Sequence, residues 1–192
     1  IDINAAGNVV LAQAFLPAMI SNNHGHFMTV ASSASYFSLP NLCAYSMSKT
    51  AALAFLESLR AELRAVYKAC RVRTSVVTPT KVRTVLAEGL NEGDDDFLMP
   101  VLEPIQVARA MADTLNSGLS RNISLPLGSA LLPYLRALPE WYRGALRAMG
   151  NTDALVTPES ISRGQQALRG HQSNLDHMKK LGVHLSLIHI SE

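Results

Sequence analysis

The stretch RVRTSVVTP, residues 71–79, decides the fold. It is rich in β-branched residues and ends in proline, which is typical of a short buried strand. An earlier run, HFMTVAS at 26–32, shows little alternation of apolar and polar residues, as expected for a strand buried on both faces. Between them, residues 42–69 repeat apolar side chains at helical spacing. Strand, helix and strand in this order predict parallel pairing through a right-handed crossover.

The same alternation extends outward from this unit. A helix is expected over 5–21, and a second over PIQVARAMADTLNSG (104–118), which Gly118 closes as its cap. A third short strand is expected at NISLP (122–126). We therefore predict an α/β fold with a doubly wound parallel sheet, Rossmann-like, of which the chain holds the C-terminal half only.

The chain divides into three parts. Residues 1–128 are expected to form this half-domain, and 129–184 a C-terminal helical extension. The extension mixes leucines, aromatic residues and arginines, so it is either a substrate lid or a segment at a lipid interface. The last eight residues, LSLIHISE (185–192), follow without a cap or a partner segment. We interpret them as a non-native tail, the alternative being a frayed native end.

Composition narrows the class of protein. At 192 residues and 48% hydrophobic content the chain can bury one core, and its net charge of +2, without an arginine and lysine cluster, argues against nucleic acid as partner. Two cysteines indicate a reducing compartment rather than a disulfide framework. The histidines, cysteines and acidic residues are not spaced as the ligands of a metal site. We expect no apolar run to be long enough to span a membrane.

A tyrosine and a lysine lie four residues apart in NLCAYSMSKTAALAF (41–55). On a helix Tyr45 and Lys49 share one face, and a cation beside a phenol favours loss of the phenol proton. The pair is therefore a candidate proton donor and acceptor near neutral pH. Ser32 ends the first strand thirteen positions before Tyr45, and Asn4 lies upstream in DINAAGN. Because ligands of such sheets bind at the carboxyl ends of the strands, we expect Ser32 and the start of this helix to face one crevice.

These motifs, with TPTKVRT (78–84) closing the second strand, resemble the short-chain dehydrogenase/reductase family of the Ser-Tyr-Lys-Asn type. The resemblance implies that Tyr45 is the catalytic acid and base and that Ser32 holds and polarises the substrate oxygen. It also implies that Lys49 supports the tyrosine and binds the cofactor ribose, and that Asn4 holds a bent helix and a water linked to Lys49.

The family resemblance, which extends from residue 1 to about 148, also implies a nicotinamide cofactor, NAD or NADP. Residues expected to contact it are Tyr45, Lys49, Pro79, Thr80, Val82 and Thr84. The family commonly has glycine where Thr80 stands, which leaves the local turn geometry open. No glycine-rich pyrophosphate fingerprint follows a strand in this sequence. We therefore expect a chain truncated at its N-terminus, whose residues 1–192 alone bind cofactor poorly and are inactive.

A finer resemblance, carried by residues 14–49 and by LPLGSALLPYLRALPEWYRG (125–144), is to the branch of membrane- and lipid-droplet-associated hydroxysteroid and retinol dehydrogenases. It implies an apolar lipid, steroid or retinoid-like alcohol or carbonyl substrate. It further implies a homodimer on the cytoplasmic side, at an endoplasmic reticulum or lipid-droplet membrane. The expected function is an NAD(P)-dependent oxidoreductase that interconverts an alcohol and a ketone or aldehyde.

Three alternatives stay open from the sequence. A catalytically inactive Rossmann-like binding or scaffold protein would keep the same residues as a relic. A Ser–Lys hydrolase is weaker, because Ser32 is not on a G-x-S-x-G elbow. The stripe of Leu56, Leu59 and Leu63 is either ordinary core or the face of a dimer.

Overall fold

The computed structural model of the chain describes residues 1–84, 87, 100–149, 156–166 and 169–170. The tail that the sequence predicts to be non-native, 185–192, lies outside these ranges, as does part of the expected extension at 129–184.

The described sheet has three strands in the order β1 (Gly25–Val30), β2 (Val72–Pro79) and β3 (Asn122–Leu125). Both neighbouring pairs are parallel, which confirms the predicted α/β fold with a parallel sheet. Burial on both faces holds only for β2, the central strand, where every residue except Arg73 is buried. β1 and β3 are more exposed because each has one neighbour in the described sheet.

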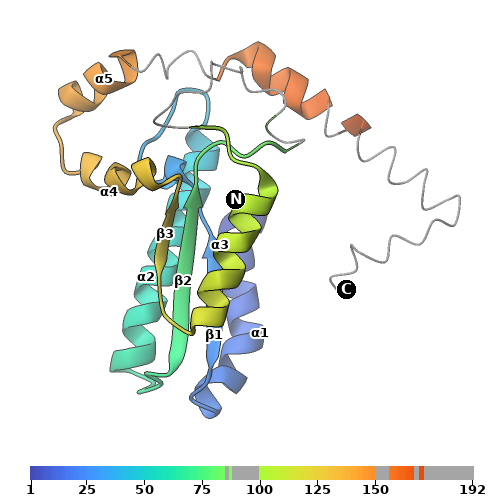
Figure 1. The fold of residues 1–192 in the computed structure, drawn as a ribbon, viewed down its shortest axis with the longest axis vertical. Helices are drawn as coiled ribbons and strands as arrows, with labels where there is room; N and C mark the ends of the chain where they lie inside the picture. The colour runs from blue at the N-terminus through green and yellow to red at the C-terminus, as the bar shows by residue number, and fades with distance from the viewer. Residues whose placement is uncertain (85–86, 88–99, 150–155, 167–168, 171–192) are drawn as a thin grey trace, which may run out of the picture.

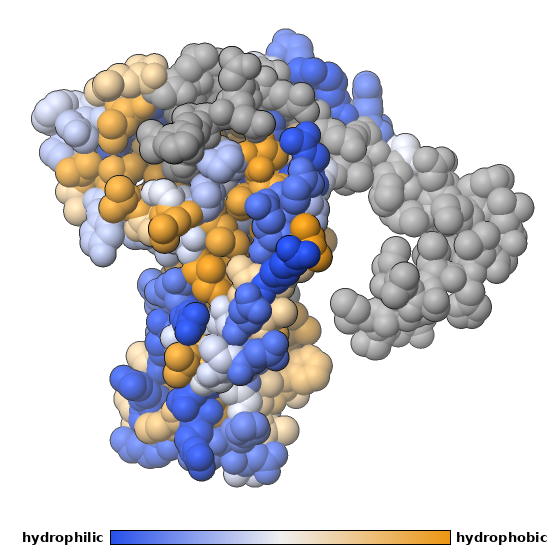
Figure 2. All heavy atoms as spheres, in the orientation of Figure 1, coloured by the Kyte–Doolittle hydropathy of each residue, from blue (hydrophilic) through white to orange (hydrophobic). Residues whose placement is uncertain are grey.

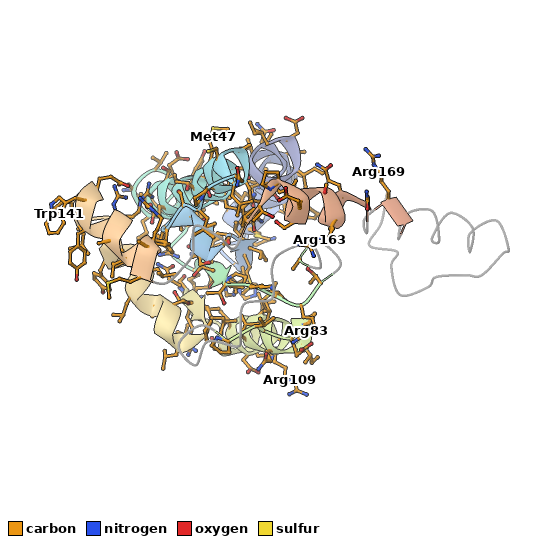
Figure 3. All side chains as sticks on the ribbon, turned by 90° about the horizontal axis from the view of Figure 1, so that it is seen from above. Met47, Arg83, Arg109, Trp141, Arg163 and Arg169 are labelled. Atoms are coloured by element: carbon orange, nitrogen blue, oxygen red, sulfur yellow. The ribbon has the colours of Figure 1, made fainter. Side chains whose placement is uncertain are left out.

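The helices lie in two layers around this sheet. α1 (Gly7–Ser21) and α2 (Cys43–Ala65) pack side by side on one face, and α3 (Pro104–Ser117) lies on the other (Figures 1 and 3). A π-helical turn, η1 (Asp2–Ala6), leads into α1. The expected helix over 5–21 therefore begins with a wider turn than an α-helix has.

The ends of α3 follow from local sequence, as predicted. Pro104 occupies the first turn, and Glu103 and Gln106 form a reciprocal capping box with each other's backbone. Gly118 ends the helix in the left-handed conformation with φ of 62°, which glycine adopts without a side-chain penalty.

The leucine stripe of α2 is core. Leu56, Leu59 and Leu63 are each at most 6% exposed and belong to one apolar cluster with Phe27 of β1 and Val76 of β2. Burying leucine side chains in this way contributes on the order of 2 kcal/mol each. The stripe therefore holds α2 against the sheet and is not available as a dimer face.

One helical run, Asp2–Ser21, is long and apolar enough to cross a membrane, so the expectation that no run reaches that length is wrong. A single helix of this kind is weak evidence for a span, because core helices and signal sequences meet the same criterion. In the structure the run packs on the sheet: Ala12 and Leu16 are buried, and Thr29 Oγ1 of β1 donates to Asn8 Oδ1 at 3.1 Å.

The C-terminal region lies beyond the carboxyl ends of the strands (Figure 1). It consists of a 3₁₀ turn η4 (Leu127–Leu131), the short helix α4 (Leu132–Leu135), α5 (Glu140–Met149) and a helical segment at 158–166. The broken amphipathic pattern around residues 131–150 thus folds as short helices joined by turns.

Candidate active site

Ser32 lies two residues beyond the end of β1, in extended conformation, and caps the 3₁₀ turn η2 (Ser33–Ser35). Its Oγ accepts a hydrogen bond from the Ala34 backbone N–H at 3.2 Å. That bond uses a lone pair of the oxygen, so the hydroxyl proton is left to donate to another group. The sequence predicted Ser32 as the last residue of the strand, whereas the strand ends at Val30 and the turn orients the serine.

Lys49 connects α2 to the carboxyl end of β1. Its Nζ donates to the carbonyl oxygen of Val30 at 3.0 Å and lies 5.9 Å from the centroid of the Tyr45 ring. A cation at this distance from an aromatic ring is attracted to it. Burial lowers the pKa of the Lys49 amine, because the charged form loses hydration.

Asn4 lies in the π-helical turn before α1, and its side chain reaches α2. Asn4 Nδ2 donates to Ser48 Oγ at 3.1 Å, and Ser48 Oγ donates to the Tyr45 carbonyl at 2.7 Å. Asn8 Nδ2 donates to the Asn4 carbonyl at 2.7 Å. π-helical turns occur frequently at functional sites. This one ties Asn4 to the helical turn that carries Tyr45 and Lys49.

Ser48 is a residue that sequence reasoning missed. It is 2% exposed and links Asn4 to the backbone of Tyr45. Its position three residues after Tyr45, on the same helix face, is the only sequence signal that could have pointed to it.

The expected cofactor contacts follow the carboxyl end of β2. Pro79 is the last residue of the strand, and the Thr80 N–H donates to the Leu125 carbonyl of β3 at 2.9 Å. Val82 forms a parallel bridge with Leu102, and Thr84 is exposed.

The turn at Thr80 carries no left-handed strain. The described non-glycine residues with positive φ are Asn23, Asn41 and Lys68, and Thr80 is not among them. A side chain is therefore tolerated where the family commonly has glycine. The Thr80 Oγ1 is buried and has no hydrogen-bond partner among the described residues.

The structure brings three of the predicted residues to one edge of the sheet. Ser32 and the amine of Lys49 are at the carboxyl end of β1, and Thr80 is at the carboxyl end of the adjacent β2. The Ser32 hydroxyl and the Lys49 amine are therefore both at this edge, and the centroid of the Tyr45 ring lies 5.9 Å from the amine. Within the described ranges, no three His, Cys, Asp or Glu side chains are grouped as metal ligands.

Comparison with known proteins identifies the family of the chain. A family profile described as short chain dehydrogenase matches residues 1–95. Estradiol 17-beta-dehydrogenase 11 of Homo sapiens is 38% identical over 148 residues, which cover 76% of this chain and 47% of that protein. Epidermal retinol dehydrogenase 2 of Mus musculus is 37% identical over 114 residues, 59% of this chain and 36% of that protein.

Solved structures give the same result. A crystal structure of a short chain dehydrogenase from Burkholderia cenocepacia in complex with NADP is 27% identical, with a TM-score of 0.57, over 81% of this chain and 57% of that one. The chain belongs to the short-chain dehydrogenase family. It spans about half the length of the curated relatives it matches.

Proposed function

We propose that the protein is an NAD(P)-dependent oxidoreductase that interconverts an alcohol and a ketone or aldehyde, with Tyr45 as general acid and base. The observation that carries the proposal is the position of the Lys49 amine, which donates to the Val30 carbonyl at the end of β1 and lies 5.9 Å from the centroid of the Tyr45 ring. We infer that this amine supports Tyr45 while the tyrosine exchanges a proton with the substrate, the role that the family resemblance implies for the pair.

Each of the other groups has a defined task in this proposal. The Ser32 hydroxyl donates its proton to the substrate oxygen. Ser32 Oγ itself accepts from the Ala34 N–H, and its proton is left for this bond. Asn4 and Ser48 keep the first turn of α2 in place through two hydrogen bonds of 3.1 and 2.7 Å. A nicotinamide cofactor, when bound, supplies hydride transfer.

The residues present fit such a cofactor. The buried Thr80 Oγ1 lacks a hydrogen-bond partner among the described residues, although buried hydroxyls in proteins usually have one. The amine of Lys49 lies at the carboxyl end of β1, and the exposed Thr84 follows the end of the neighbouring β2 in the chain. We propose that these side chains, with Pro79, Val82 and Tyr45, contact the cofactor.

A titration and a substrate panel on the full-length protein test the proposal. Cofactor fluorescence should change on addition of protein, and at least one apolar alcohol or ketone should be turned over with NAD(H) or NADP(H). Cofactor binding without turnover of any compound in a panel of steroids, retinoids and fatty alcohols would instead favour the inactive binding or scaffold protein.

We propose an apolar substrate, and two observations support it. The relatives named above are called estradiol and retinol dehydrogenases. In addition, Figure 2 shows hydrophobic residues gathered over the region of α4. Leu127, Leu131 and Tyr134 there are 84%, 69% and 73% exposed. This region lies beyond the strand ends, on the side of the sheet where the site is (Figure 1).

We further propose a lipid surface as a partner of α4 and α5, which would place the protein on the cytoplasmic side of an endoplasmic reticulum or lipid-droplet membrane. Trp141 is 74% exposed and points away from the sheet (Figure 3). Residues 127–149 carry three arginines and one glutamate, a net charge of 3 − 1 = +2. Exposed aromatic and aliphatic residues with arginines are typical of segments that lie at a membrane interface.

Liposome flotation distinguishes binding of α4 and α5 to a lipid surface from a role as a substrate lid alone. The double substitution Leu131→Asp, Trp141→Asp should reduce the fraction of protein that floats with anionic vesicles, because it puts two charges on the apolar face. The matched control is Val66→Asp, since Val66 is 67% exposed but follows the far end of α2. Equal flotation of the wild type and the double variant would remove the lipid surface from the account.

A homodimer is proposed on separate grounds. α1 exposes Val9, Val10, Leu11 and Phe15, each at least 40% exposed, and a second copy would cover this apolar face. A monomer at all concentrations in sedimentation equilibrium would contradict the dimer.

A further inference from the structure

The loop at 33–42 joins the two halves of the candidate active site. It begins directly after Ser32 and ends directly before α2, whose first turn carries Tyr45. Any displacement of this loop therefore changes the position of the Ser32 hydroxyl relative to the Tyr45 hydroxyl. Its start is ordered by backbone hydrogen bonds, with the N–H groups of Ser35 and Phe37 donating at 2.9 and 3.0 Å.

The C-terminal region holds this loop at three points. Arg136, directly after α4, donates through Nη1 to the Ser35 carbonyl at 3.3 Å. The guanidinium of Arg147 in α5 lies 5.7 Å from the centroid of the Phe37 ring. At the far end of the loop, Asn41 Nδ2 donates to the Val156 carbonyl at 2.7 Å.

The Ser35 carbonyl, which accepts from Arg136, also accepts a hydrogen bond from α2. The Ser35 carbonyl also accepts from Thr50 Oγ1 at 3.2 Å, so one peptide group is bonded to α2 and to the C-terminal region at once. Ser35 is only 2% exposed, so water cannot readily replace a lost donor. The charge of Arg136 also acts on the loop itself, since it opposes the rise in the pKa of Tyr36 that burial and Glu57 cause.

Asn41, which donates to the Val156 carbonyl, has an uncommon backbone conformation. Asn41 has φ of 61°, in the left-handed region that asparagine tolerates better than most residues. The chain turns here immediately before α2 begins at Cys43. The side chain that permits the turn is thus the one that anchors it to Val156.

We propose that the C-terminal region, residues 127–149 and 156–166, is a brace that fixes the loop at 33–42 and so sets the separation of the Ser32 and Tyr45 hydroxyls. Arg136 and Asn41 are positioning residues in this arrangement, because they act through the loop. The inference rests on the proposed function for its catalytic consequence, because reacting groups displaced by about 1 Å can lose about 100-fold in rate.

Hydrogen exchange tests the brace without any assay of activity. In the full-length protein, Arg136→Ala and Asn41→Gly should each speed exchange of the amides in 33–42 several-fold, because local opening becomes easier. Glycine at 41 keeps the left-handed turn and removes only the side-chain bond. Exchange in β2 (72–79) should not change. Arg109→Ala is the matched control, an exposed arginine on α3, and unchanged exchange of 33–42 in both test variants would overturn the brace.

Kinetics test the positioning role. Arg136→Ala and Asn41→Gly should lower kcat by about 10- to 100-fold, because the positions of Ser32 and Tyr45 relative to each other shift. The KM for cofactor should change much less, because the cofactor contacts proposed after β2 are not altered. Arg136→Lys should recover part of the rate, since it restores a charged donor to the Ser35 carbonyl. Faster exchange with an unchanged kcat would refute the positioning role. If the wild type turns over no compound, the proposed function fails, and the exchange result alone decides whether the brace exists.

Discussion

The substitution Tyr45→Phe in the full-length protein is expected to reduce turnover by about 10²- to 10⁴-fold, the range typical for loss of a general acid or base. The fold should be unaffected. The ring that Lys49 faces is retained, and Ser48 donates to the backbone carbonyl of residue 45, which the substitution does not alter. Cofactor binding should also persist, since only one hydroxyl is removed.

Steady-state kinetics, thermal unfolding and cofactor titration of this variant check the prediction together. Tyr67→Phe is the matched control, because Tyr67 is 49% exposed and follows the other end of α2. Turnover by Tyr45→Phe at the level of the wild type would exclude the phenol as the proton-transfer group and with it the proposed mechanism.

The substitution Lys49→Met should have the second-largest effect, with turnover lower by about 100-fold or more, because the proposed support of Tyr45 and a proposed cofactor contact are lost together. The free energy of unfolding, in contrast, should increase. Burial lowers the pKa of Lys49, which means that the folded state holds the charged amine at a cost. Methionine has a similar length and no charge to desolvate, so the variant should resist urea better than the wild type near neutral pH.

The stability difference should depend on pH in a defined direction. The unfolded chain binds the Lys49 proton more tightly than the folded state, so wild-type stability rises as pH increases through the lowered folded pKa toward the ordinary value of 10.5. The difference in unfolding free energy between Lys49→Met and the wild type should therefore narrow as the pH rises toward 10.5. Arg64→Met on the same helix serves as control, and a gap that widens over this range would contradict the assignment of the cost to Lys49.

The elements of the fold that local chemistry determines could be predicted from the sequence. Pro104 and Gly118 mark both ends of α3, and the β-branched run at 72–79 is the central strand. Exposure of β1 and β3 could not be predicted, because a run of apolar residues does not show how many neighbours its strand has. The leucines of α2 likewise fit a core or an interface until the sheet beneath them is known.

In the candidate active site, too, contacts between residues far apart in the sequence could not be predicted. The intervals between Ser32, Tyr45 and Lys49 predicted one shared edge of the sheet, since a strand end and the start of the next helix are close along the chain. Ser48 could not be predicted, because its partner Asn4 lies 44 residues away in the sequence. The contacts of the C-terminal region with the loop at 33–42 span still longer separations, up to 115 residues, and only the tertiary structure reveals them.

The central claim is that Ser32 and Tyr45 hold one substrate oxygen between them. A crystal structure of the full-length protein with nicotinamide cofactor and an unreactive ketone analogue tests it most directly. The account predicts that Ser32 Oγ and the Tyr45 hydroxyl oxygen both lie within about 3 Å of the ketone oxygen. A complex in which the two hydroxyls point to different sides of the loop, with the ketone bound to only one of them or to neither, would contradict it.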